Sequence, residues 1–166
     1  MSDLRVINGQ RGRVAIFKVD DRSEAIEAVA NETILDANRD ALRDDEFVVV
    51  QGKVQPDRFN GGSLRLNVTH VWDLPAARAR FGRYLSVQVN GDIVPLTELV
   101  RQWPARRTSD EHGDSIHGLG VRIKVRTEGA AAELDLGDQG RFWPSDDALA
   151  RWKQIMPAQP PQVVYD

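Results

Sequence analysis

The order of short apolar segments between residues 4 and 74 restricts the folds open to this chain more than any other feature. Turn-forming residues interrupt the stretch at 8–13, 20–23 and 58–62. The segments between them have the apolar patterning of strands, at residues 4–7, 13–19, 24–30, 47–54 and from 64 onward. A helical pattern follows Asn31, with Ile34, Leu35, Asn38, Ala41 and Leu42 at helical spacing. This order of three strands, a helix and two strands predicts a small antiparallel barrel.

Five strands and one helix in this order are typical of the oligonucleotide-binding barrel (OB fold), which holds single-stranded nucleic acid on its sheet and loops. Cations in such barrels neutralise phosphates, and aromatic rings stack on bases. The candidate DNA-binding residues are therefore Arg11, Arg13, Phe17, Arg22, Lys53, Arg58, Phe59 and Arg65. The alternative is that the turn arginines are only solvated and that Phe17 is a core residue. Because only residues 4–7 precede the first turn, we expect the barrel to lack part of its first strand.

The net charge of −3 excludes a protein that binds polyanions over its whole surface, so any nucleic-acid contact requires a local basic patch. Residues 1–83 carry 13 Lys and Arg against 13 Asp and Glu, and residues 84–166 carry 9 against 12. In the first half the cations concentrate at turns. Many acids gather in the predicted helix and after it, at Asp36, Asp40, Asp44, Asp45 and Glu46. One end of the barrel can therefore be basic although the net charge of residues 1–83 is zero.

Past residue 83 the pattern becomes that of a small α+β unit. Strands are predicted at residues 84–89, 121–125, 132–136 and 163–165. One helix is predicted after Pro95 and another after Ser145, which is placed to cap it. The polar, glycine-bearing segment 106–118 is the predicted linker. The large apolar residues of this half either fill its core or dock a partner, and the candidate partner-binding residues are Trp152, Tyr165 and Asp166.

Several motifs together resemble a known family. In the barrel they are VDDRS at 19–23, DDEFVVVQGKV at 44–54 and RFNGGSLR at 58–65. In the second half they are GLGVRI at 118–123, the strand at 131–136 and WPSDDAL at 143–149. Their type, order and spacing resemble the C-terminal region of the bacterial DNA polymerase III alpha subunit, where a late barrel precedes a domain that docks the tau subunit of the clamp loader. The resemblance implies single-stranded DNA, tau and other replisome subunits as partners.

The catalytic parts of that family have no counterpart in these residues. The polymerase palm, the N-terminal phosphoesterase-like domain and the internal sliding-clamp motif are all absent. The resemblance therefore implies a non-catalytic part of a replicative polymerase. The chain has no cysteine, no secretory signal and no apolar run long enough for a membrane, so we expect a cytoplasmic location, no membrane partner and no cofactor.

Clusters of acids and histidines have ordinary explanations. Histidine and carboxylate side chains are common metal ligands, and five of them lie close together at Asp110, Glu111, His112, Asp114 and His117. They fall in the predicted linker, where nothing fixes ligand geometry. The acid pairs at 20–21 and 146–147 suit a turn and a helix start. We therefore expect no metal site and no catalytic residue.

The predicted fold class is mixed β and α+β, with an OB-fold-like antiparallel barrel at residues 1–75 followed by a small α+β interaction domain at 76–166. The predicted function is to hold single-stranded template through the barrel and to dock tau through the second domain. The alternative is a stand-alone OB-fold adaptor that binds protein rather than DNA. The zero net charge of the barrel half favours this alternative, whereas the arginines at the turns favour DNA.

Overall fold

The computed structural model describes residues 1–9, 12–57, 61–89, 95–111 and 113–166. The chain divides into two compact units, Met1–Leu74 (unit 1) and Pro75–Asp166 (unit 2). Unit 1 carries 10 Lys and Arg against 13 Asp and Glu, and unit 2 carries 12 of each. The acidic excess therefore lies in unit 1, because Arg78, Arg80 and Arg83 belong to unit 2 rather than to the barrel. None of the described helices is long and apolar enough to cross a membrane.

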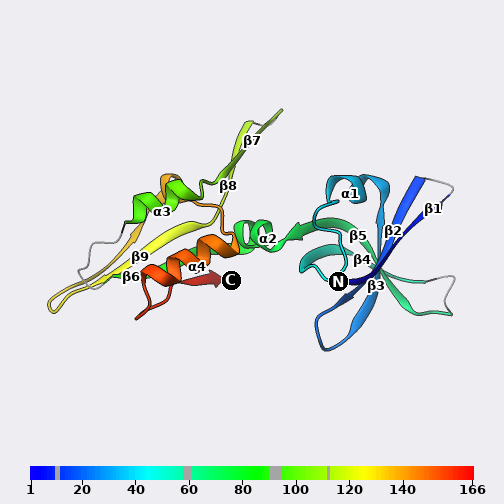
Figure 1. The fold of residues 1–166 in the computed structure, drawn as a ribbon, viewed down its shortest axis with the longest axis horizontal. Helices are drawn as coiled ribbons and strands as arrows, with labels where there is room; N and C mark the ends of the chain where they lie inside the picture. The colour runs from blue at the N-terminus through cyan, green and yellow to red at the C-terminus, as the bar shows by residue number, and fades with distance from the viewer. Residues whose placement is uncertain (10–11, 58–60, 90–94, 112) are drawn as a thin grey trace. The chain divides into compact units, whose positions relative to one another are not determined.

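Unit 1 is a five-stranded sheet with one short helix (Figure 1). Its elements are β1 (Ser2–Gly9), β2 (Gly12–Asp20), β3 (Ala25–Asn31), α1 (Glu32–Ala37), β4 (Val48–Pro56) and β5 (Leu64–Asp73). The strands lie in the order β1-β2-β3-β5-β4, and all pairs are antiparallel except β3–β5. The predicted order of elements is confirmed. Within the described residues no pairing joins β1 to β4, so the sheet is not closed into a barrel.

The first strand is longer than predicted. β1 has eight residues, whereas the sequence pattern covered four. Its beginning is held to the segment before β4, because the ammonium of Met1 donates to the carbonyl of Glu46 at 2.8 Å and the N–H of Leu4 donates to Oδ1 of Asp44 at 2.9 Å. These contacts join residues about forty positions apart, so a local pattern could not reveal them.

Helix α1 begins where predicted and ends earlier. The Oδ1 atom of Asn31 accepts a hydrogen bond from the N–H of Ile34 at 3.0 Å, which satisfies one of the free donors of the first turn. At the other end, the Nδ2 atom of Asn38 donates to the carbonyl of Ile34 at 2.8 Å. Asparagine competes with the helical hydrogen bonds in this way and stops the helix. Ala41 and Leu42 therefore lie in turns beyond the helix, although Leu42 is still buried.

The core of unit 1 contains one aromatic ring among small side chains. Its buried residues are Ala15, Phe17, Ala28, Ala30, Leu35, Leu42, Val68 and Val71. The strand predicted at 47–54 begins one residue later, at Val48, and Phe47 is 69% exposed. Since β4 is at the edge of an open sheet, Val48, Val49 and Val50 are only partly buried.

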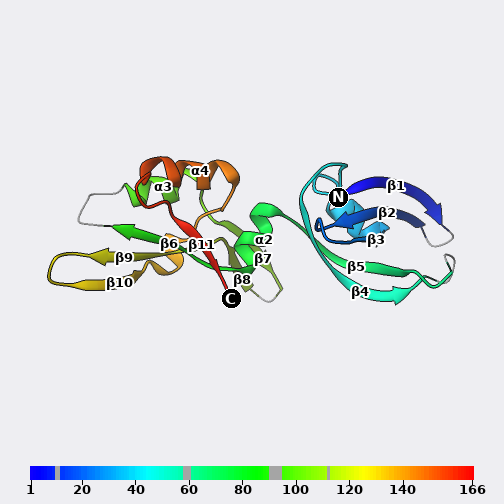
Figure 2. The same ribbon diagram turned by 90° about the horizontal axis from the view of Figure 1, so that it is seen from below.

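Unit 2 is a four-stranded sheet covered on one side by helices (Figure 2). Its elements are α2 (Leu74–Phe81), β6 (Gly82–Val89), α3 (Leu96–Gln102), β7 (Arg106–Asp110), β8 (Gly113–His117), β9 (Gly120–Arg126), β10 (Ala131–Asp135), η1 (Gly137–Gly140), α4 (Asp146–Ile155) and β11 (Gln162–Tyr165). The sheet order is β10-β9-β6-β11, with β6 and β9 parallel. The Oγ atom of Ser145 caps α4 by accepting from the N–H of Ala148, as predicted.

The predicted linker at 106–118 is a hairpin instead. β7 pairs with β8 from Arg106↔His117 to Asp110↔Gly113. Side chains reinforce the pairing, since Thr108 and His117 are hydrogen-bonded at 2.9 Å and the hydroxyl of Ser109 donates to Asp114 at 2.6 Å. Most of its side chains are polar and exposed, so the two strands lack the apolar alternation by which strands are predicted.

Candidate nucleic-acid interface

The sheet of unit 1 has one covered face and one open face. α1 contacts β2, β3 and β5 over the buried face. Neighbouring residues of a strand point to opposite faces, and paired residues of adjacent strands share a face. The strand registers therefore define what we call the unit 1 open face: Arg5, Ile7, Val14, Ile16, Lys18, Glu27, Val29, Asn31, Arg65, Asn67, Lys53 and Gln55.

One row of this face crosses all five strands. It consists of Arg5, Ile16, Val29, Asn67 and Lys53, each in register with the next. The two aliphatic side chains lie in the middle of the sheet and the two cations lie on its edge strands. Such a row can contact bases at its centre and phosphates at its ends. The Nδ2 atom of Asn67 donates to Oε1 of Gln55 at 3.0 Å, which orients both amides on the face.

The unit 1 open face is locally basic although unit 1 is acidic. Four cations lie on it, Arg5, Lys18, Lys53 and Arg65, against Glu27, the neighbouring Asp3 and Asp57, which contacts Arg65. Lys18 contacts Asp3 at 2.9 Å and holds the pKa of that carboxyl below its usual range, and Arg5 lies 3.8 Å from Glu27. Exposed ion pairs of this kind contribute little to stability, so a phosphate can replace the acid.

Arg65, a predicted DNA contact, is bound within the protein. Its guanidinium contacts Glu27 at 2.9 Å and Asp57 at 2.7 Å. Asp57 is buried, and its N–H donates to the carbonyl of Ser63 at 2.7 Å. The network thereby fixes both ends of the β4–β5 connection. Arg65 therefore holds Asp57 at the end of β4, and among the predicted residues that the structure describes, Lys53 on β4 is exposed on the face.

Arg13, another predicted contact, is paired with acids of α1. Its Nε atom contacts Glu32 at 2.7 Å, which raises the pKa of Arg13, and its NH2 group contacts Asp36 at 2.9 Å. The pKa of Asp36 is lowered, first by Arg39 and then by Arg13. In β2, Arg13 alternates with the open-face residue Val14 and so belongs to the helix side of the sheet. A DNA phosphate would have to displace two carboxylates to reach it.

Phe17 and Arg22 also lie away from the open face. Phe17 is 1% exposed and is the largest side chain of the unit 1 core, so it has no free ring for stacking. Arg22 is in the turn after β2 with a φ of 73°, at the opposite end of that strand from the β1–β2 connection. Three further candidates, Arg11, Arg58 and Phe59, lie outside the described residues.

The strand ends on either side of residues 10–11 and of residues 58–60 lie at one end of unit 1 (Figures 1 and 2). They are the adjoining ends of β1 and β2 and those of β4 and β5. OB folds bind their ligands with the β2–β3 face and with the β1–β2 and β4–β5 connections. The residues missed by the sequence analysis are Arg5, Lys18, Asn67, Gln55, Ile16 and Val29. Alternation in β2 was visible in the sequence, but the row appears only when the strand registers are known.

The predicted partner-binding residues of unit 2 have different environments. Trp152 is 0% exposed and packs with Phe142, whose ring centroid is 5.6 Å away, so its predicted place on a surface is wrong. An aromatic residue on the covered side of α4 is the natural filler of this core. Tyr165 is 52% exposed on the edge strand β11, and Asp166 contacts Arg83 at 3.2 Å.

The acid and histidine clusters have structural partners. The described residues contain no group of three or more His, Cys, Asp or Glu arranged to hold a metal ion. Asp21 accepts hydrogen bonds from the hydroxyl and N–H of Ser23 and the N–H of Glu24, which lower its pKa to about 2. Asp146 contacts Arg78 at 2.7 Å. His112 lies outside the described residues.

Comparison with known proteins agrees with this geometry. Residues 2–74 match the family described as OB-fold nucleic acid binding domain. DNA polymerase III subunit alpha of Vibrio cholerae is 34% identical over 156 residues, which are 92% of this chain and 13% of the relative. The corresponding subunit of Pseudomonas aeruginosa is 29% identical, covering 89% and 12%, and that of Escherichia coli K12 is 27% identical, covering 98% and 14%. The chain thus spans about one eighth of the length of these relatives. Residues 2–74 therefore form an OB-fold domain, and nearly the whole chain is similar to a region of the DNA polymerase III alpha subunit.

Proposed function

We propose that this chain is a non-catalytic part of a replicative polymerase that holds single-stranded DNA template on the unit 1 open face. The observation that carries the proposal is the row from Arg5 to Lys53, which places aliphatic side chains between cations across the whole sheet. In a protein of the length of these relatives, polymerase activity would depend on the other seven eighths of the sequence. We also propose a cytoplasmic location, as expected for DNA replication in bacteria.

The chemistry of the face favours a single strand. Cations at the edges can neutralise phosphates, and the release of condensed counterions then supplies much of the binding free energy. Ile16 and Val29 can contact unstacked bases, and the amides of Asn67 and Gln55 can bond their edges. The most acidic segment, between α1 and β4, contributes no residue to the open face.

Charge removal on this face tests the proposal. We expect Lys18→Ala with Lys53→Ala to weaken binding of a labelled oligothymidine of about 16 nucleotides, the upper site size of one OB fold. The slope of log affinity against log salt should fall by about 1.4, because each single-strand phosphate contact contributes about 0.7. Fluorescence anisotropy at several salt concentrations measures both quantities.

A matched control removes the same charge elsewhere in unit 1. Arg39→Ala with Arg43→Ala takes two exposed cations from the turns after α1, where they pair with Asp36 and Asp40. This variant should bind the oligothymidine as well as the unmodified chain or slightly less well. If the two double variants lose equal affinity and slope, the open face is not the DNA site.

For unit 2 we propose docking of the clamp-loader tau subunit. The resemblance of the second half to the tau-docking domain supports the proposal, and so does the exposed ring of Tyr165 on the edge strand β11. Exposed aromatic residues anchor many protein interfaces. Deletion of residues 157–166 would not test tau docking cleanly. It would also remove Val163, which packs against the core, and Pro161, which is buried.

A point substitution tests the proposed docking of tau more specifically. Tyr165→Ala should weaken binding to purified tau by at least tenfold in surface plasmon resonance, as expected for an aromatic hot spot. Phe47→Ala, which removes an exposed aromatic ring from unit 1, is the control and should leave binding unchanged. Equal binding by both variants would exclude Tyr165 as the anchor.

A second candidate function is that of an adaptor whose unit 1 binds protein. The observation that favours it is the excess of 13 acids over 10 cations in unit 1, together with Ile7, which is 49% exposed on the open face. Salt dependence separates the two candidates. Binding of DNA weakens steeply as salt rises, whereas binding of a protein to an aliphatic face changes little.

A further inference from the structure

The sheet of unit 2 also has an open face, formed by the side opposite α3 and α4. On the covered side, Leu85, Val87, Val121 and Ile123 are buried in the core. The strand registers place the alternate residues on the other side. We call these the unit 2 open face: Tyr84, Ser86 and Gln88 on β6, Arg122, Lys124 and Arg126 on β9, Ala131, Glu133 and Asp135 on β10, and Gln162 and Val164 on β11.

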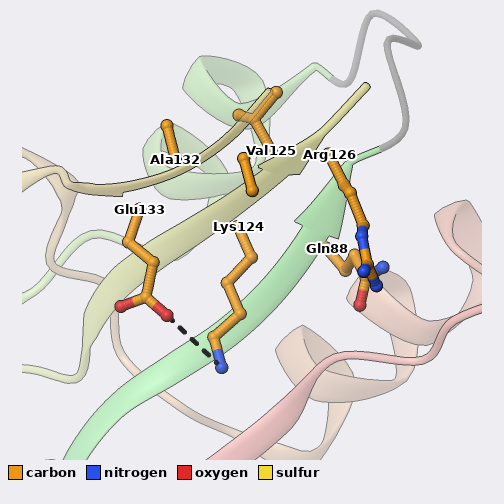
Figure 3. A pocket seen from close by; sticks show the side chains of 7 residues that line it. Gln88, Lys124, Val125, Arg126, Ala132 and Glu133 are labelled. Atoms are coloured by element: carbon orange, nitrogen blue, oxygen red, sulfur yellow. Dashed lines mark ion pairs between the residues drawn. The ribbon is translucent and has the colours of Figure 1, made fainter. Parts of the chain in front are cut away.

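A row of cations follows the central strand of this face. Arg122, Lys124 and Arg126 are alternate residues of β9, so they recur about every 6.7 Å. Figure 3 shows Lys124, Arg126 and Gln88 on the same side of the β6–β9 pair. A regular row of this kind is complementary to a ligand chain that repeats one anionic group per unit.

The acids on the face hold the cations weakly. Lys124 lies 3.6 Å from Glu133, and Arg122 lies 3.5 Å from Asp135 and 3.9 Å from Glu133. These pairs are long and largely exposed, so each contributes about 1 kcal/mol or less and can be exchanged for a ligand anion. No acid in the described part of the chain is paired with Arg126. All acids of the face lie on the edge strand β10, and β6 and β11 contribute none to it.

Two adjoining hollows lie beside the cations. One, of about 280 Å³, is lined by Gln88, Lys124 and Arg126 together with Ala131 and Glu133. The other, of about 350 Å³, shares Gln88 and Lys124 and is otherwise lined by Ser86, Gln159, Pro160 and Gln162. Cations, three amides and a hydroxyl therefore line the two hollows. The ring of Tyr84 lies under the guanidinium of Arg122, 4.0 Å from its centroid.

We propose that the unit 2 open face is a second binding surface for single-stranded nucleic acid. The phosphates would contact Lys124 and Arg126, and the amides of Gln88, Gln159 and Gln162 would bond base edges, which present both donors and acceptors. An acidic peptide would match the cations equally well but would leave the three amides without a specific role. The amides therefore favour nucleic acid.

Paired variants of the whole chain test this surface separately from unit 1. Lys124→Ala with Arg126→Ala should lower the salt slope for the labelled oligothymidine by about 1.4 and the affinity by about tenfold. Arg151→Ala with Lys153→Ala is the control, because it removes two exposed cations of α4 from the same unit. Its slope should equal that of the unmodified chain, and circular dichroism should give equal melting temperatures for both variants.

The outcomes distinguish this inference from the proposed function. Equal slopes for the two unit 2 variants would overturn the inference, whatever Lys18→Ala with Lys53→Ala does in unit 1. A loss confined to the β9 variant would support the inference and count against the unit 1 site. An oligoglutamate peptide that competes with the oligothymidine at equal charge concentration would also overturn it, since that result would identify an acidic peptide as the occupant.

Discussion

The two units use their aromatic residues in the same way and their charges differently. Unit 1 packs one ring, Phe17, among small aliphatic residues, whereas unit 2 packs Trp152 against Phe142. In each unit the core holds at least one fully buried ring, and the open sheet faces carry mainly cations, amides and aliphatic side chains, with the ring of Tyr84 under Arg122 in unit 2. In unit 1 the key arginine, Arg65, contacts a buried acid, whereas in unit 2 the cations of the open face contact exposed acids. The buried rings therefore stabilise the two units, whereas the proposed binding of single-stranded DNA depends on the charged faces.

The largest expected effect is on the core of unit 2. Trp152→Ala should reduce the free energy of unfolding of unit 2 by about 3–5 kcal/mol, because it leaves a cavity beside Phe142. Hydrogen exchange followed by mass spectrometry should show β6 and β9 opening while β2 and β3 stay protected. Trp152→Phe keeps a ring and should be less damaging, since the indole N–H has no partner among the described residues. A loss below 1 kcal/mol for the alanine variant would contradict the assigned core.

The next largest effect is expected from removing an arginine of the unit 1 sheet, compared with removing one from the unit 2 sheet. Arg65→Ala should destabilise unit 1 by about 3 kcal/mol, because it removes the ion pairs that the guanidinium makes with the buried Asp57 and with Glu27. Arg122→Ala in unit 2 should lose about 1 kcal/mol or less, because its acids are exposed. Urea unfolding monitored separately for the two units measures both. Similar losses would show that the two networks do not differ as described.

Helix caps should give a smaller and nearly equal effect in both units. Asn31→Ala removes the acceptor for the N–H of Ile34, and Ser145→Ala removes the acceptor for the N–H of Ala148. Each should reduce stability by about 1 kcal/mol. Asn31→Ser and Ser145→Asn keep a capping oxygen and should restore most of the loss. If these rescuing variants are as unstable as the alanine variants, the side chains have another role.

The smallest effect depends on pH. The pKa of Asp21 is about 2 in the folded chain and near 3.8 when unperturbed, so its ionised form stabilises unit 1. That contribution is complete above about pH 4 and is lost as the pH falls toward 2. Asp21→Asn should therefore be less stable than the unmodified chain at pH 5, and the difference should shrink between pH 4 and pH 2. Thermal melts across this range measure it.

A parallel substitution in unit 2 serves as the comparison. The N–H of Gly137 donates to Asp135 at 2.9 Å and lowers the pKa of that carboxyl, with a smaller contribution from Arg122. Asp135→Asn should show the same direction of pH dependence. A difference that is constant with pH for both variants would exclude the titration of these turn acids as its cause.

Local signals in the sequence predict much of the fold. Gly61 and Gly62 have positive φ in the predicted β4–β5 turn, and Asn31 and Ser145 cap the helices that were expected after them. These features depend on neighbouring residues only. The β7–β8 hairpin was missed because its stability comes from cross-strand pairs such as Ser109 with Asp114, which are polar and carry no apolar period.

The candidate site was less predictable, because it depends on contacts between distant segments. In the sequence Arg13 resembles a free cation in a turn. In the structure it is paired with Glu32 and Asp36 of α1. Arg5 and Lys18 become candidate DNA contacts only when the strand registers place them on the same face as Lys53. Lys53 lies 35 residues after Lys18 in the sequence. Phe17 and Trp152 were candidates as exposed rings, and the fold buries both.

We propose that single-stranded DNA lies across the unit 1 open face. Backbone amide chemical-shift mapping by NMR, with the whole chain and an oligothymidine of about 16 nucleotides, tests it most directly. We expect the largest shifts at Ile16, Val29 and Asn67, and small shifts at α1 residues such as Leu35. Shifts concentrated at α1, or none in β2, β3 and β5 at saturating DNA, would contradict the account.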